Sequence, residues 1–260
     1  MALDIAALRA KLNTFQGQNQ RSSAFWRPTE GKSQVRIVPI TDCPENPFIE
    51  LYFHYLGNRS HLSPISHGNR DPIAEFAENL RAEGTRDAYQ QARAFMPKLR
   101  TFVPVVVRGE EDKGVRFYSF GKTVYQALLS YIADPDYGDI THIETGRDIV
   151  VDYTPQDKSD TNFAKTTILV KPNQTPLSED SELVERWTTN QPNTDKLFKE
   201  PTFEELSVVL QRYLDPNSAD EDTNTTSTTE QVTAPAKVQA SSGGDKVKSA
   251  VDEFESLFAE

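Results

Sequence analysis

The stretch from Phe95 to Lys122, FMPKLRTFVPVVVRGEEDKGVRFYSFGK, decides how this chain folds. It contains two runs rich in Val, Phe and Tyr, Phe102–Val107 and Val115–Phe120, separated by the acidic segment Gly109–Gly114. β-Branched and aromatic residues favour strands, and a short polar segment with glycines at its ends favours a turn. We therefore expect two strands joined by that acidic turn.

The second of these strands alternates in character from one residue to the next. Successive side chains of a strand point to opposite faces, so Arg116, Tyr118 and Phe120 share one face. Four more residues continue this mixture of cations and rings: Lys98, Arg100, Phe102 and Lys122. Rings that stack on bases, beside cations that attract phosphates, are what binding to a single strand without sequence preference needs. A core face would alternate in the same way, so burial of Tyr118 and Phe120 stays an open alternative.

Two further segments place rings beside cations. In the first, basic residues such as Lys32 and Arg36 flank the run that follows Trp26. In the second, Phe163 stands in an otherwise polar loop near Lys165. A ring in a polar loop is harder to explain by burial than a ring in a strand. Together with the central stretch, these segments predict a binding cleft lined by rings and cations.

The rest of the body has the same strand-like runs, interrupted by helices. Further strands are predicted at Val35–Ile40, Phe48–Tyr55, Asp148–Tyr153 and Phe163–Val170. Helices are predicted from Pro72 to Gly84, over Thr123–Ala133, and from the capping box Thr202–Glu205 to Leu214. Short strands with interspersed helices favour a mainly β fold. We expect an OB-fold-like β-barrel core with inserted helices.

Composition divides the chain into three regions. Residues 1–22 form an N-terminal arm whose short helix would dock on its own core or on a neighbouring copy. Residues 23–214 form the OB-fold-like core, and residues 215–260 form an acidic tail that is predicted to be disordered. Apolar residues recur at helical spacing near the end of the tail: Val251, Phe254, Leu257 and Phe258. This pattern predicts a segment that docks on partner proteins, with a purely solubilising tail as the alternative.

The net charge of −11 at first argues against a nucleic-acid partner, because neutralising phosphates takes Lys and Arg. The charge is unevenly distributed, however. The tail from Asp215 holds 10 acidic and 3 basic residues, a net of −7. The segment Arg93–Lys122 holds 7 basic and 3 acidic residues, a net of +4. The sequence therefore predicts a basic stripe and an acidic tail.

Composition also narrows the class of protein. No apolar run is long enough to cross a bilayer, and charges interrupt the first 15 residues where a signal peptide would need an apolar core. The single cysteine, Cys43, is typical of a protein in a reducing cytoplasm. We expect a cytoplasmic protein that is neither secreted nor bound to a membrane.

Catalytic and metal-binding motifs give little support to other functions. The sequence lacks the signatures of P-loop nucleotide hydrolases, serine hydrolases, zinc proteases and dinucleotide-binding proteins. His54, His61, His67 and Cys43 lie near one another in the sequence, but without the closely spaced pairs that are typical of zinc sites. We therefore expect no enzyme, no catalytic residue and no metal.

The order of these motifs resembles that of the single-stranded DNA-binding (helix-destabilising) proteins of T-even-like bacteriophages. The resemblance covers most of residues 1–214. It is carried by Val35–Pro39, His67-Gly68 with Asp71-Pro72, Lys98-x-Arg100 and Val115–Lys122. Its most specific part is Phe117–Lys122, followed by an amphipathic helix.

The resemblance implies a function and a set of site residues. It implies an OB-fold core that coats single-stranded DNA during replication, recombination and repair in the host cytoplasm. It also implies an arm that makes binding cooperative and an acidic tail that recruits replication and recombination proteins. The positions that match the family's cleft are Arg36, Lys98, Arg100, Phe102, Tyr118 and Phe163.

The chain also departs from the family. The family's zinc subdomain uses one histidine and three cysteines, whereas Ser63, Asp71 and Ala74 stand here where cysteines would fall. The departure implies that zinc is lost and that the helix from Pro72 packs in its place. The arm also lacks the family's early cluster of basic residues followed by Ser or Thr.

Two other functions stay open from the residues alone. Lys113-Gly114, Phe117 and Phe120 fall where an RNA-recognition module places such residues, although Val115 and Arg116 do not match it. An acidic protein-interaction hub, whose core only positions the tail, would not bind nucleic acid at all. A strand-binding protein would lose affinity steeply with added salt, which separates it from such a hub.

Overall fold

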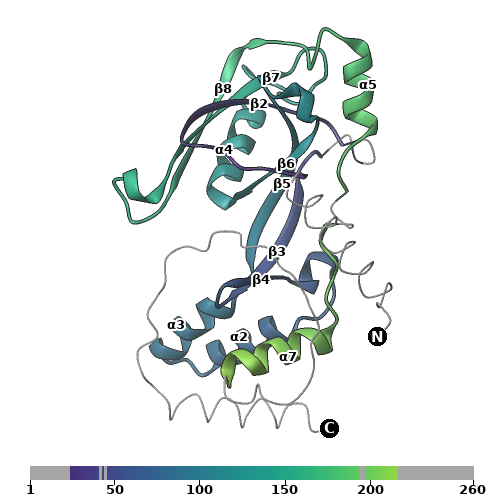
Figure 1. The fold of residues 1–260 in the computed structure, drawn as a ribbon. Helices are drawn as coiled ribbons and strands as arrows, with labels where there is room; N and C mark the ends of the chain where they lie inside the picture. Colours follow the sequence, from purple (N-terminus) through teal and green to yellow (C-terminus); the bar gives the residue numbers. More distant parts are fainter. Residues whose placement is uncertain (1–23, 41–42, 44–45, 194–196, 216–260) are drawn as a thin grey trace, which may run out of the picture. The chain divides into compact units, whose positions relative to one another are not determined.

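The computed structural model describes residues 24–40, 43, 46–193 and 197–215, which divide into two compact units (Figure 1). Unit 1 comprises the chain up to Glu50 and Arg100–Leu197, and unit 2 comprises Leu51–Leu99 and the chain from Phe198. The predicted arm (residues 1–22), the tail beyond Asp215 and the four docking positions Val251, Phe254, Leu257 and Phe258 lie outside the described residues.

Unit 1 is built on a mixed sheet with the strand order β1-β6-β5-β2-β7-β8. Neighbouring strands are antiparallel except for β1 and β6, which run parallel. The strands are β1 (Phe25–Trp26), β2 (Gly31–Ile37), β5 (Lys98–Val107), β6 (Arg116–Gly121), β7 (Arg147–Thr154) and β8 (Lys165–Gln174). The two strands predicted from the central stretch are thus β5 and β6, hydrogen-bonded as a hairpin.

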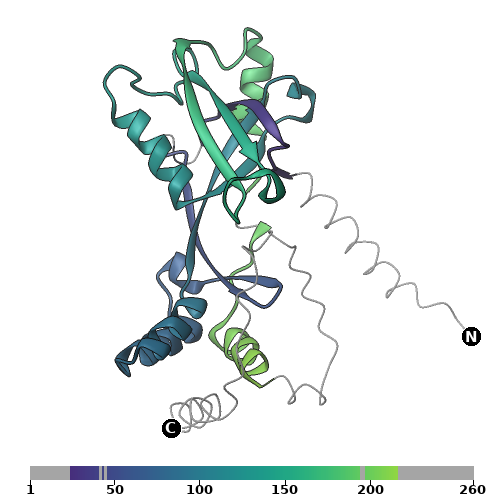
Figure 2. The same ribbon diagram turned by 90° about the vertical axis from the view of Figure 1, so that its left-hand side faces the viewer.

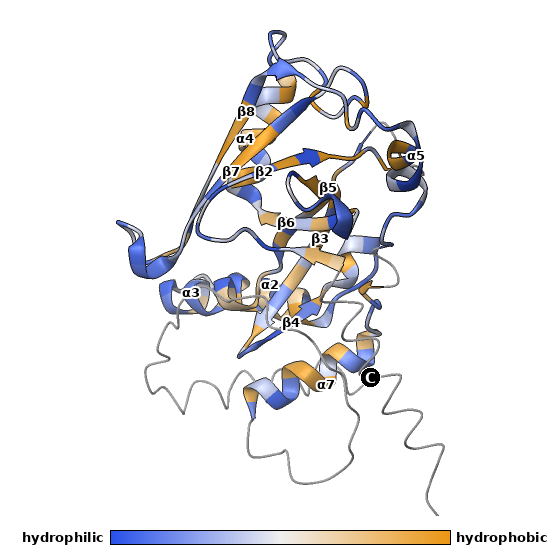
Figure 3. Cartoon of the chain, turned by 45° about the horizontal axis from the view of Figure 1, so that its top comes forward, coloured by the Kyte–Doolittle hydropathy of each residue, from blue (hydrophilic) through white to orange (hydrophobic). Residues whose placement is uncertain are grey.

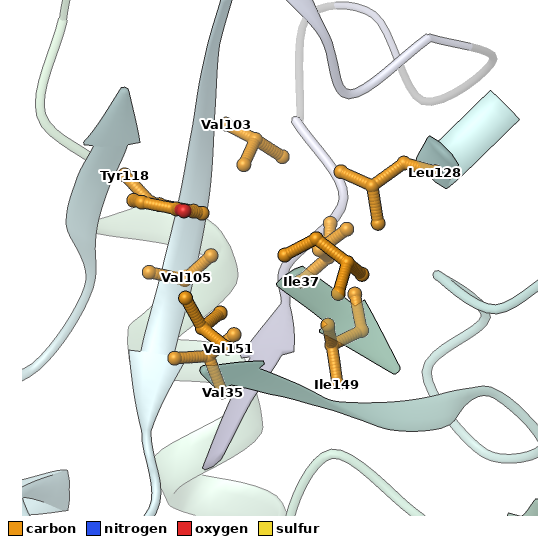
Figure 4. A pocket seen from close by; sticks show the side chains of 9 residues that line it. Val35, Ile37, Val103, Val105, Tyr118, Leu128, Ile149 and Val151 are labelled. Carbon is orange, nitrogen blue, oxygen red and sulfur yellow. The ribbon is translucent and has the colours of Figure 1, made fainter. Parts of the chain in front are cut away.

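One face of this sheet forms the main hydrophobic core of unit 1. The face consists of alternate residues of each strand, such as Val35, Val105 and Val151, and helix α4 (Lys122–Ala133) adds Val124 and Leu128. These side chains line a small cavity of about 10 Å³. Figure 4 shows the residues that line it. Its lining is apolar and its volume is that of about one water molecule, so it offers no ligand site.

The opposite face is partly covered by a second, smaller cluster. Helix α5 (Ser181–Thr189) begins at Asp180, whose side chain accepts a hydrogen bond from the Glu182 amide and so caps the helix. Trp187 of this helix is buried against Val38 and Val106 of the sheet.

Within the described residues, unit 2 combines a hairpin with three α-helices. Its elements are β3 (Ile49–Leu56), β4 (Arg59–Leu62), the 3-10 turn η1 (Pro64–His67), α2 (Pro72–Ala82), α3 (Arg86–Phe95) and α7 (Phe203–Leu214). The capping box predicted at Thr202 and Glu205 is present at the start of α7. Figure 2 shows α7 as the yellow-green helix. Figure 3 shows hydrophobic and hydrophilic stretches in turn along α7. Its apolar side brings Leu206 and Leu210 into a core shared with α2 and α3.

The structure confirms a mainly β chain with inserted helices. The predicted strands and helices are present within a few residues of their expected bounds, whereas β1, β4, α3 and α5 were not predicted. Helix α3 has few large apolar residues, since its buried positions are Ala88, Ala92 and Phe95, so its sequence carries a weak apolar pattern. None of the described helices is long and apolar enough to cross a membrane.

Candidate nucleic-acid interface

The central stretch places its rings in the core. Arg116, Tyr118 and Phe120 do share one face of β6, as their alternation predicts, but this face packs against the valines of β5 and helix α4. Tyr118 is 4% exposed and Phe120 is 3% exposed, and the Tyr118 ring lies 5.0 Å from the ring of Trp26. The structure therefore corrects the expectation that these rings are open to bases. It supports the alternative, in which Tyr118 and Phe120 are buried in the core.

Arg116 is also turned inward. Its guanidinium is largely buried and donates a hydrogen bond of 2.6 Å to Glu110 Oε2. Hydrogen bonds from Arg116 and Lys113 lower the pKa of the Glu110 carboxyl. Arg116 is thus held by the acidic turn before β6 and does not face phosphates.

The opposite face of β5 and β6 carries a second group of rings. Phe102 and Phe117 are buried, and the ring of Phe25 in β1 lies 6.1 Å from the first and 6.3 Å from the second. Arg100, which is half-buried at the edge of this group, donates a hydrogen bond of 3.3 Å to Ser119 Oγ. Strand β1 covers the rings that a base would need to reach, so Phe102 is a structural residue in this conformation.

Arg36 has a structural position rather than an open one. It is fully buried, and its Nη2 donates a hydrogen bond of 2.6 Å to the carbonyl oxygen of His142. Desolvation, opposed by the nearby Asp148 carboxylate, lowers the pKa of Arg36 to about 10. The guanidinium also fills the space beside Gly146, where an added Cβ would lie 2.4 Å from Arg36 Nη2. The expected contact between Arg36 and phosphates is therefore corrected: Arg36 holds the 140–147 turn.

Phe163 is the predicted ring that the structure leaves open. It is 54% exposed in the loop between β7 and β8. The loop is ordered by its own hydroxyl groups, since Thr161 Oγ1 bonds to the Phe163 carbonyl at 3.1 Å and lies 3.0 Å from Ser159 Oγ. A ring that is held out of the core by a polar loop is available for stacking.

Lysines lie on the strands next to this loop, on a face that also carries Asp152 of β7. Strand β2 pairs with β7 only as far as Tyr153, so the end of the β7–β8 hairpin extends past its neighbour (Figure 1). The register places several exposed or half-exposed side chains on the face of β2 and β8 that points away from the main core: Lys32, Lys165, Leu169 and Lys171. We call these four residues the outer hairpin face. Leu169, 58% exposed, adds an apolar surface among the cations.

One cation of the loop is already paired. Lys158 Nζ lies 2.7 Å from each carboxylate oxygen of Glu30, in the turn between β1 and β2. Both side chains are more than half exposed, and the hydrogen bond from Lys158 to Glu30 raises the pKa of the lysine. The loop that carries Phe163 is thus tied to the β1–β2 turn by an ion pair at the surface.

The two remaining predicted cations lie elsewhere. Lys122 is exposed at the start of α4. Lys98 belongs to unit 2, where its Nζ lies 5.7 Å from the centre of the Tyr55 ring. Sequence reasoning missed Glu30 and Leu169. For Leu169, the available signal was its place in a strand-like run between Lys165 and Lys171.

The described residues offer no donor set like that of the zinc subdomain in the family that the sequence resembles. None of them form a group of three or more His, Cys, Asp or Glu side chains placed to hold a metal ion. Of the positions considered, Asp71 contacts a histidine, His54, and Ser63 donates a hydrogen bond to the same Asp71 oxygen. Ala74, at the third position, has no donor atom in its side chain.

Comparison with models of known protein families finds none that matches this chain, and comparison with curated proteins likewise finds no match.

Proposed function

We propose that this protein binds single-stranded DNA without sequence preference, and that it coats and protects the strand in bacteriophage replication, recombination and repair. The observation that carries the proposal is Phe163, an exposed ring in an ordered loop beside the outer hairpin face. A stacked ring supplies about 1–3 kcal/mol per base, and nearby lysines attract the phosphates. The site needs no reaction chemistry, so we propose a binding protein and not an enzyme.

The connectivity of unit 1 supports an OB-like barrel as the framework. Counting β2, β5, β6, β7 and β8 as strands one to five, the sheet order is three-two-one-four-five, and α4 lies between strands three and four. This order is the one expected for the partly open Greek-key barrel that we propose. OB folds bind oligonucleotides with the strand two–three face and with the loops after strands one and four. The loop after strand four is the one that carries Phe163.

The acidic tail complements this proposal. We propose that it recruits replication and recombination proteins through Val251, Phe254, Leu257 and Phe258, and that the arm of residues 1–22 associates with a neighbouring copy on the strand. The tail carries a net charge of −7 and is repelled by the phosphates of DNA, so deleting the tail should strengthen DNA binding. We further propose that the protein acts in the host cytoplasm and needs no metal.

A titration of the full chain tests the proposal. Intrinsic fluorescence is followed while poly(dT) or duplex DNA is added at two salt concentrations. We expect binding to the single strand, with log affinity falling by about 0.7 per log unit of salt for each phosphate neutralised. Absence of binding to either nucleic acid would overturn the proposal and favour the acidic interaction hub. Binding to RNA alone would favour the RNA-recognition function.

Two variants locate the site. Phe163→Ala should weaken poly(dT) binding by about 5- to 150-fold, which corresponds to the loss of one stacked base. Tyr89→Ala is the matched control, because Tyr89 is a ring of similar exposure, 51%, on helix α3 of unit 2. Because both rings are exposed, neither change should alter the melting temperature much. Equal affinities of the two variants and the wild type would remove Phe163 from the site.

A further inference from the structure

Unit 2 contains a fully buried polar cluster at its centre that DNA binding does not explain. His54 of β3 has no exposed surface, and its two ring nitrogens face two different acceptors. Nδ1 lies 2.7 Å from the carbonyl oxygen of Phe95, at the end of α3. Nε2 lies 2.8 Å from Asp71 Oδ2, at the start of α2. The ring therefore joins three elements that are distant in the sequence.

The hydrogen-bonding chemistry fixes how many protons the ring carries. A carbonyl oxygen only accepts, so Nδ1 must donate to Phe95. An ionised carboxylate also only accepts, so Nε2 must donate to Asp71. With Asp71 ionised, a neutral imidazole, which has one N–H, would leave one of the two contacts without a proton. A doubly protonated ring satisfies both.

Asp71 is saturated as an ionised acceptor. Oδ1 accepts the amides of Ile73 at 2.9 Å and Ala74 at 3.1 Å, which caps α2. Oδ2 accepts His54 Nε2 and the hydroxyl of Ser63. These four donors match the four acceptor positions of a carboxylate. Burial of Asp71 alone would raise its pKa. The hydrogen bond and charge of His54, together with the hydrogen bonds from Ser63 and the Ala74 amide, outweigh burial and lower the pKa of Asp71.

The neighbouring titratable groups are compatible with a cation at His54. His61 pairs directly opposite His54 in β4. Burial, with the positive charges of Arg59 and His54, lowers the pKa of His61. The strand opposite the cluster thus contributes a histidine that favours its neutral form, and α2 contributes the balancing carboxylate.

We propose that His54 and Asp71 form a buried imidazolium–carboxylate pair that closes unit 2 without a metal, with Ser63 as its third member. Both ring nitrogens of His54 and both carboxylate oxygens of Asp71 are committed to other atoms of the protein, so none of these four atoms is open to a cation such as Zn²⁺. This inference is independent of DNA binding. The pair connects the β3–β4 hairpin to helices α2 and α3.

NMR spectroscopy on the full chain with ¹⁵N-labelled histidine tests the protonation state directly. The chain has four histidines, and a His54→Gln variant assigns the His54 signals. At neutral pH we expect both His54 nitrogens to show the shift and one-bond proton coupling of a protonated nitrogen. An unprotonated nitrogen on His54 would overturn the proposal, and this result does not depend on whether any other variant folds.

Thermal unfolding tests the structural part. Asp71→Asn retains an amide oxygen that can cap α2 but removes the charge, and an unpaired buried cation should lower the melting temperature by roughly 6–20 °C. Glu75→Gln is the matched control on the same helix, since Glu75 pairs with an exposed Arg70 at 2.8 Å; it should change the melting temperature by about 2 °C or less. EDTA should leave the wild-type transition unchanged. A chelator-sensitive transition, or Asp71→Asn melting like the wild type, would overturn the proposal.

Discussion

Replacing Tyr118 by alanine tests whether this ring belongs to the core. The side chain is 4% exposed and also lines the small cavity beside Val103 and Leu128. Burying an aromatic side chain removes about 150–250 Å² from water, which at about 25 cal/mol per Å² corresponds to roughly 4–6 kcal/mol. Because the unfolded chain already buries part of this area, that figure is an upper value. We expect a loss of about 3–5 kcal/mol in the free energy of unfolding, as for other large-to-alanine changes in cores.

Urea unfolding followed by tryptophan fluorescence measures this loss. Trp26 lies against Tyr118, and Trp187 is buried in the same unit, so the signal reports on unit 1. Tyr118→Phe is the control, since it keeps the ring and should cost about 1 kcal/mol or less. A loss below about 1 kcal/mol for Tyr118→Ala, accompanied by weaker binding to poly(dT), would refute the reasoning and return Tyr118 to the DNA-binding surface.

Three further changes test other parts of the structure. Glu30→Gln frees Lys158 from its ion pair, and we expect poly(dT) affinity at low salt to rise by no more than about 5-fold; an unchanged or weaker affinity would show that Lys158 does not face the strand. Gly146→Ala forces a methyl group against Arg36 and two carbonyl oxygens, so the free energy of unfolding should fall by about 1–3 kcal/mol, read as a lower urea midpoint; a wild-type midpoint would contradict the buried position of Arg36. The lowered pKa of Asp71 implies stability that is present above the ordinary carboxyl pKa and lost as the pH falls through the lowered value; urea midpoints measured down to acid pH should fall less steeply for Asp71→Asn than for the wild type.

The sequence was a good guide to elements and a poor guide to faces. Alternation correctly placed Arg116, Tyr118 and Phe120 on one side of a strand. It could not say which side the core would occupy, because both sides of β6 carry rings and Phe25 of the unpredicted strand β1 covers the second. Only the arrangement of the whole sheet decides between them.

The cations show a similar limit. Arg36 lies in a strand beside buried valines. The sequence does not reveal that its guanidinium donates a hydrogen bond to the His142 carbonyl and lies 3.8 Å from the Asp148 carboxylate inside the protein. Phe163 was predictable for the opposite reason: the polar residues of its own loop keep it out of the core, and that information is local. Exposure that depends on local sequence could be predicted, and burial that depends on distant partners could not.

The division of unit 2 between two stretches of chain has a consequence during synthesis on the ribosome. The hairpin, α2 and α3 of this unit leave the ribosome before most of unit 1, but α7 follows the whole of unit 1. Until α7 emerges, Ile73 and Phe76 lack the cover of Leu206 and Leu210, which are fully buried in the finished protein. The apolar surface around Ile73 and Phe76 therefore stays uncovered by α7 while the sheet of unit 1 is synthesised. Unit 2 is therefore completed only after the whole of unit 1 has been synthesised.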